Sequence, residues 1–259
     1  MSEKVFVLGN GLSRKNIDPS KLDGTVIGCN ACYRDFTPDV ICAIDAGVIS
    51  DIVESGFDGD CYFTHNSWNL LPAETYSTVA DGTEYETERK VGDNNFVYIS
   101  GYDAKIEKSQ KYIIWVPKDK EHKIKNIGTK VKGWSTGTSA IYVACRDFTC
   151  NDYEKVYLLG FDHNNDKYDN LYADTEHYFG KDSIIRKGYI YHDTITKDRI
   201  QCYTRINGWI DMHKEWTEQI IKIIKEHPAL QFIWVNYQGD DFPKLPNLFS
   251  KDEKEICQF

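Results

Sequence analysis

Two apolar runs that end in glycine constrain the fold of this chain more than any other feature. Residues 5–8 are wholly apolar and lead into Gly9-Asn10-Gly11, and residues 156–159 lead into Gly160, with Asp162 close behind. A short, continuous apolar run bounded by turn residues is typical of a parallel strand buried on both faces. Such strands end in tight turns whose backbone N–H groups can face a nucleotide phosphate. The pattern predicts a nucleotide-binding α/β fold.

Strands and helices are expected to alternate along most of the chain. Strands are predicted at 4–8, 25–29, 40–44, 61–64, 155–160 and 231–236. Helices are predicted at 48–54, at 140–148 with Thr138 or Ser139 as the N-cap, and at 209–227, where apolar residues recur with a helical period. This alternation predicts an α/β fold with a Rossmann-like, mostly parallel sheet.

The length of 259 residues predicts a single domain, 1–259. The pattern blurs at about 66–132, where we expect insertions with strands near 96–99 and 112–116, and at about 163–208, where we expect a lid or small subdomain. The tail from Gln238 is rich in turn residues and is expected at the surface.

Composition narrows the class of protein. The net charge of −9 argues against a surface dominated by nucleic-acid backbone contacts, although residues 118–132 are lysine-rich and adjoin Trp115 and Trp134. No apolar run approaches the roughly 20 residues that span a bilayer, and no signal peptide is recognisable, so a cytoplasmic location is expected. The eight cysteines lack paired CxxC spacing and are expected to be reduced, without zinc. The aromatic content would allow a homo-oligomer.

Four polar residues are expected at the carboxyl ends of four strands. They are Asn10, Asn30, Asp45 and Asp162. Ligands of open α/β sheets bind beyond these ends, so a shared crevice is predicted, with the amide of Asn30 suited to a base or ribose. The hydroxyl of Ser13 and the charges of Arg14 and Lys15 would serve a phosphate. The sequence Ser135-Thr136-Gly137 precedes a helix and could receive a phosphate or carboxylate.

The order of these motifs resembles that of a known family. Leu8-Gly9-Asn10-Gly11-x-Ser13, Cys29-Asn30, Ser-Thr-Gly before a helix, Val-Tyr-Leu-x-Gly-x-Asp and Tyr172-Ala173-Asp174-Thr175 follow one another over residues 4 to about 175. The chain thereby resembles bacterial sialyltransferases that use CMP-sialic acid, and it is similar to motility-associated glycosyltransferase-like proteins and uncharacterised phage-borne relatives. The resemblance implies a Rossmann-like glycosyltransferase that does not require a metal.

The resemblance also implies roles for individual residues. Asn10 and Asn30 would contact the nucleotide, and Asp162 would hold the ribose or base. Ser135, Thr136 and Gly137 would line the sugar or its phosphate, and Tyr172 would stabilise the departing phosphate.

Two positions depart from the family pattern. Asp45 stands where those enzymes carry an asparagine near the donor, which leaves open a different donor sugar or the use of a metal. The catalytic histidine has no clear counterpart; His192 and His177 lie in the right region, and we favour His192 as the base.

The predicted function is a glycosyltransferase that moves a sugar from a UDP- or CMP-linked donor to an acceptor hydroxyl. The acceptor could be a glycan, a protein, a small molecule or a hydroxymethylated pyrimidine in phage DNA, for which residues 118–132 would offer a basic edge. The alternatives are a pyrophosphokinase-type transferase with Mg²⁺ on Asp45 and Asp162, or a nucleotide-binding module without catalysis. Asp58-Gly59-Asp60 precedes a strand rather than following one and is not expected to bind metal.

Overall fold

The computed structural model describes residues 4–63, 68–71, 76–78, 84–86, 94–103, 108–131, 133–149, 155–162, 170–178, 189–192, 199–202 and 208–256. Within 68–118, 189–202 and 208–214, and at Ala46 and Glu121, it describes the backbone alone.

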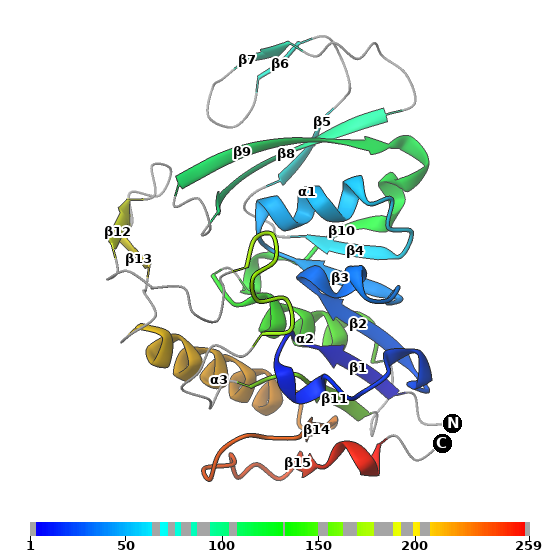
Figure 1. The fold of residues 1–259 in the computed structure, drawn as a ribbon, viewed down its shortest axis with the longest axis vertical. Coiled ribbons are helices and arrows are strands. Elements are labelled where there is room, and N and C mark those ends of the chain that lie inside the picture. Colours follow the sequence, from blue (N-terminus) through cyan, green and yellow to red (C-terminus); the bar gives the residue numbers. More distant parts are fainter. Residues whose placement is uncertain are drawn as a thin grey trace.

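Eight parallel strands form the main sheet, in the order β10-β4-β3-β2-β1-β11-β14-β15 (Figure 1). Their bounds are β1 (Lys4–Leu8), β2 (Thr25–Cys29), β3 (Val40–Ala43), β4 (Asp60–Phe63), β10 (Ile124–Asn126), β11 (Lys155–Leu159), β14 (Gln231–Val235) and β15 (Leu248–Lys251). From β1 the chain adds strands on one side as far as β10, and then returns to the other side of β1 with β11. The predicted α/β fold with a parallel sheet is confirmed, and its topological switch point lies between β1 and β11.

Alternating side chains of the strands build two apolar layers. On one face, Val7, Leu158 and Trp234 pack with residues of α2 (Thr136–Asp147) and α3 (Gly208–Glu226). On the other face, Leu8 and Leu159 pack in a cluster with Ile17, Cys32 and Ile256 from the segments outside the strands. The outer strands β3 and β4 are covered on this second face by α1 (Ala46–Glu54). Because both faces are covered, the strands read as continuous apolar runs.

Short 3-10 segments lie in the loops between the strands and after the last strand. They are η1 (Leu12–Arg14), η2 (Pro19–Lys21), η3 (Asn30–Arg34), η4 (Lys118–Lys123), η5 (Thr129–Val131) and η6 (Glu253–Glu255).

The segment between β4 and β10 forms antiparallel structure. β5 (Trp68–Leu71), β8 (Asn94–Asp103) and β9 (Lys108–Pro117) make a three-stranded sheet, and β6 (Tyr76–Thr78) pairs with β7 (Glu84–Glu86). The strands expected near 96–99 and 112–116 lie within β8 and β9, which run over α1 (Figure 1). In the predicted lid region, β12 (Tyr189–His192) pairs antiparallel with β13 (Arg199–Cys202).

One local prediction is wrong, and another is incomplete. Helix α2 begins at Thr136 with Ser135 as its N-cap, because the Ser135 side chain accepts the Thr138 N–H at 3.1 Å and the Thr138 side chain is itself buried. The tail from Gln238 lies at the surface as expected, with only Leu248 and Ile256 buried among residues 238–256, and it also forms β15 and η6, since β15 pairs with β14 from Phe232↔Leu248 to Val235↔Lys251. Among the described residues no helix is both long and apolar enough to cross a membrane.

Candidate functional site

The turns that follow β1 and β11 are joined directly through their backbones. The N–H of Gly9 donates to the carbonyl of Leu159 at 2.8 Å, and the N–H of Gly11 donates to the carbonyl of Gly160 at 2.9 Å. A Cβ atom at Gly9 would lie 2.5 Å from the Gly160 oxygen, so glycine is required for this close approach. The expectation that these N–H groups face a ligand is wrong for Gly9 and Gly11, because neighbouring carbonyls satisfy them.

Asp162 occupies the start of η1, where a phosphate was expected. Its carboxylate accepts the backbone N–H of Ser13 at 2.9 Å, and the Ser13 hydroxyl donates to its other oxygen. A side chain at Gly11 would collide with this carboxylate. The structure thus brings Gly11, Ser13 and Asp162 together at the switch point, but as partners of one another.

Residues 170–178 cross the carboxyl ends of β1 and β2, and we name them the covering segment. The N–H of Leu171 donates to the carbonyl of Asn10 at 2.9 Å, and Asn170 forms an isolated antiparallel bridge with Gly11. Two of its residues, Asp174 and His177, have left-handed backbones, with φ values of 67° and 63°. Left-handed backbone is unfavourable for residues with a Cβ, so tertiary contacts must hold the segment in this shape.

Asn10 lies under the covering segment. Its Nδ2 donates to the hydroxyl oxygen of Tyr178 at 3.2 Å, and its Oδ1 accepts from the Cys32 thiol at 3.4 Å. The same Tyr178 oxygen accepts the backbone N–H of Ala31 at 3.4 Å. Tyr178 therefore bridges the ends of β1 and β2.

Asn30 carries the clearest mark of an unfilled site. It follows β2 directly with a left-handed backbone at φ 49°, and its side-chain Oδ1 is buried without a hydrogen-bond partner among the described residues. A buried polar atom without a partner is rare in folded proteins, and strained backbone persists where function requires it. Asn30 therefore offers a hydrogen-bond acceptor to a ligand that carries a donor.

Arg14 is buried rather than placed at the surface or in a phosphate site. Only 4% of it is exposed, and its Nε donates to the Gly9 carbonyl at 2.5 Å. Its Nη2 donates to the Cys32 sulfur at 3.3 Å and to the Tyr172 hydroxyl at 3.1 Å. Tyr172 donates in turn to Asp35 at 2.7 Å. Burial raises the pKa of both Cys32 and Tyr172, so both stay neutral beside the guanidinium.

Ser135, Thr136 and Gly137 lie at the start of α2, beside the end of β11. The Ser135 hydroxyl is engaged as the N-cap, and a Cβ at Gly137 would lie 2.9 Å from the Phe161 ring. This contact places the positive end of the α2 dipole at the carboxyl edge of the sheet.

The remaining predicted residues lie further from the switch point. Asp45 is the N-cap residue of α1, beyond β3, and its side chain makes no capping hydrogen bond. His177 lies in the covering segment with its Nε2 3.2 Å from an Asp51 oxygen. His192 ends β12 opposite Arg199, and its side chain lies outside the described part of the chain.

The lysine-rich stretch proves to be largely paired with carboxylates. Lys120 and Lys123 contact Asp58, and Lys125 lies 2.6 Å from Asp60. These pairs also engage both carboxylates of the Asp-Gly-Asp sequence. A further lysine, Lys130, pairs with Glu226 at 2.8 Å.

Sequence reasoning missed the residues that join the covering segment to the sheet. These are Cys32, Arg34, Asp35, Asp51 and Tyr178. No local pattern distinguishes them, because their partners are distant in the chain. Comparisons with protein-family models, with curated proteins and with solved structures each found no match to this chain.

Proposed function

We propose that this chain is a glycosyltransferase that uses a pyrimidine nucleotide sugar, CMP- or UDP-linked, and transfers the sugar to an acceptor hydroxyl. The observation that carries the proposal is the Oδ1 of Asn30 at the carboxyl end of β2, which is buried and has no hydrogen-bond partner within the part of the chain that the structure describes. An acceptor atom in this place suits a ribose hydroxyl or a pyrimidine N–H, and it does not suit a phosphate oxygen. The sequence order of motifs supports transfer of a sugar as the reaction.

The phosphate of the donor is proposed to lie at the start of α2. The turn after β1 is filled by Asp162, whereas α2 presents its N-terminus at Thr136 and Gly137 on the same edge of the sheet. A helix N-terminus favours an anionic group through its dipole and its first N–H groups.

His177 is proposed as the base that activates the acceptor hydroxyl. It belongs to the covering segment next to Tyr178, and the Asp51 carboxylate beside it would stabilise the imidazolium formed on proton transfer. His192 remains a prediction, because its side chain lies outside the described residues.

The acceptor is proposed to be a glycan, a protein or a small molecule. Phage DNA is less favoured, because Lys120, Lys123 and Lys125 are paired with carboxylates. The magnesium-dependent alternative needs Asp162 as a ligand, and that carboxylate already accepts two hydrogen bonds from Ser13.

The first test is nucleotide binding by thermal shift and calorimetry, with CMP, UMP, UDP, GDP and ADP, each with and without Mg²⁺. A ligand at 100 times its Kd adds about 2.7 kcal/mol to the free energy of unfolding. We expect one pyrimidine nucleotide to stabilise the protein without Mg²⁺. Stabilisation by a purine nucleotide alone, or only with Mg²⁺, would contradict the proposal.

The decisive variant is Asn30→Gly. Glycine adopts φ 49° without strain, and it removes the side chain whose buried Oδ1 has no hydrogen-bond partner among the described residues, so the variant should be at least as stable as the wild type. We expect it to lose nucleotide affinity by at least about tenfold, which corresponds to one buried hydrogen bond of about 1.4 kcal/mol. Unchanged affinity would refute the role of Asn30. Turnover is followed by NMR as loss of the intact nucleotide sugar in the presence of candidate acceptors.

A further inference from the structure

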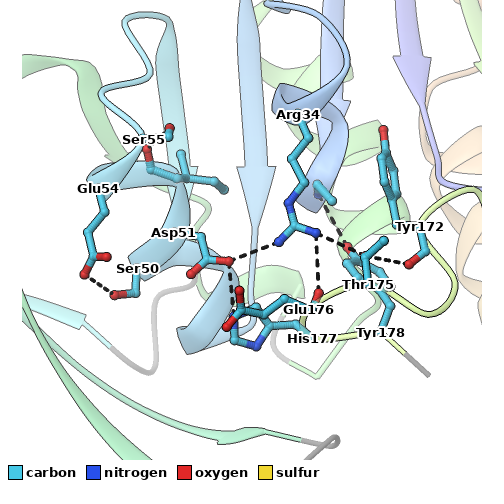
Figure 2. Close-up of polar contacts among 12 residues, drawn as sticks. Arg34, Ser50, Asp51, Glu54, Ser55, Tyr172, Thr175, Glu176, His177 and Tyr178 are labelled. Carbon is cyan, nitrogen blue, oxygen red and sulfur yellow. Dashed lines mark hydrogen bonds and ion pairs between the residues drawn. The ribbon is translucent and has the colours of Figure 1, made fainter. Parts of the chain in front are cut away.

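Asp51 on α1 stands between the guanidinium of Arg34 and the imidazole of His177, which come from other elements (Figure 2). Its Oδ2 lies 3.0 Å from Nη2 of Arg34 and 3.2 Å from Nε2 of His177. The side chains of Asp51 and Arg34 are each 24% exposed, and that of His177 is 13% exposed. Partial burial of this kind makes the attraction between Arg34 and Asp51 stronger than that of a surface ion pair.

Arg34 also holds the covering segment. Its Nη1 donates to the Thr175 hydroxyl at 3.2 Å and to the Glu176 carbonyl at 3.4 Å. Arg34 ends η3, Asp51 lies on α1, and His177 follows Glu176 directly. Three elements therefore meet at one carboxylate, and Figure 2 shows the His177 ring turned toward it.

We propose that Asp51 is a positioning residue for His177 in the transfer reaction; this rests on the proposed function. The acceptor O–H bond breaks as its proton passes to His177, and the acceptor oxygen bonds to the anomeric carbon. The bond from that carbon to the phosphate oxygen breaks, and the nucleotide leaves with the electron pair. Asp51 fixes the orientation of the ring and stabilises the imidazolium. Arg34 holds Asp51 and residues 175–176 at fixed positions relative to each other.

The backbone of His177 supports a positioning role rather than a simple tether. The Arg34–Asp51 pair and the two bonds from Arg34 to the covering segment already join α1, η3 and that segment. His177 is nevertheless held at φ 63°, a conformation that residues with a Cβ rarely adopt. The segment thus accepts an unfavourable backbone that brings this ring to the carboxylate.

The test compares Asp51→Asn with Glu54→Gln in the full-length protein. Asparagine keeps an acceptor for Arg34 and removes the charge beside His177. Glu54 lies one turn further along α1 and contacts Ser50 at 3.1 Å, so Glu54→Gln is a matched loss of charge away from the imidazole. We expect Asp51→Asn to lower kcat by about tenfold to a hundredfold, because a residue that positions the base should contribute no more than the 10²–10⁴-fold of the base itself. Nucleotide Kd should stay unchanged, and Glu54→Gln should change neither quantity.

A second readout does not depend on turnover. In ¹⁵N-histidine NMR, with His177 assigned by its absence in His177→Gln, the ring resonances should move in Asp51→Asn and stay in place in Glu54→Gln. Unmoved resonances would overturn the proposal, as would an unchanged kcat. A parallel loss of kcat, nucleotide affinity and stability would also overturn the proposal, because it would show that Asp51 maintains the fold rather than positions His177. If the wild type turns over no nucleotide sugar, the proposed function fails, and the NMR comparison alone decides whether Asp51 governs His177.

Discussion

Replacing Tyr172 with phenylalanine tests whether the covering segment is fastened through a buried cation. The hydroxyl of Tyr172 accepts from Arg14 at 3.1 Å and donates to Asp35 at 2.7 Å, and 4% of the residue is exposed. Hydrogen bonds to charged groups contribute about 1.5–3 kcal/mol each, and the bond to exposed Asp35 is partly replaced by water in the variant. We therefore expect Tyr172→Phe to lower the free energy of unfolding by about 2–3 kcal/mol.

The assay is equilibrium unfolding in urea, followed by circular dichroism and extrapolated linearly to water. Tyr237→Phe is the matched control, because its hydroxyl contacts exposed Asp241 at 3.2 Å and should contribute less than about 1 kcal/mol. In hydrogen exchange, the Leu171 amide, which is bonded to the Asn10 carbonyl, should lose protection in Tyr172→Phe. A loss no larger than that of Tyr237→Phe, with Leu171 still protected, would refute the reasoning.

Two further predictions concern the sheet. Gly11→Ala places a Cβ against the Asp162 carboxylate and 2.7 Å from the Gly160 oxygen, so the two turns must move apart. In urea unfolding, the free energy of unfolding should fall by about 1–3 kcal/mol. A variant as stable as the wild type would contradict this packing. Burial raises the pKa of the Cys61 thiol from 9.0 to about 12. The folded state holds this proton more tightly than the unfolded state does. The contribution of the thiol to the free energy of unfolding is therefore constant below pH 9 and is lost between pH 9 and about 12. The loss should follow a slope of about 1.4 kcal/mol per pH unit. Urea unfolding at pH 8 to 11 should show a shallower decline in Cys61→Ala, and equal slopes would speak against the assignment.

The central strands were predictable because each is a continuous apolar run that can be recognised without knowledge of its neighbours. β1 and β2 have the predicted bounds, and β11 and β14 differ from prediction by one residue, since each is an apolar run buried on both faces. The edge strands β10 and β15 were missed. Each is short and partly polar, and each forms only because a neighbouring strand supplies its partner.

The position of the switch point was predictable from the sequence, and the contacts made there were not. Glycine-rich turns after β1 and β11 indicate the switch point correctly. The identity of the group that fills the turn after β1 depends on Asp162, about 150 residues away, whose hydrogen bond to Ser13 no local pattern reveals. Arg14 was expected to serve a phosphate for the same reason, because its burial depends on contacts with Tyr172 and Cys32.

The position of β1 has a consequence for the order in which the protein can be completed. β1 is an inner strand of the finished sheet, yet its partner on one side, β11, begins only at Lys155. Until residue 155 has been synthesised, β1 can therefore pair on one side alone, with β2. It is then an edge strand of an incomplete sheet, and its outer N–H and C=O groups have no strand partner. A fragment that ends before β11 would expose this apolar edge of β1 to pairing with other chains. Once residues 155–159 are present, β11 pairs with β1 and covers the edge.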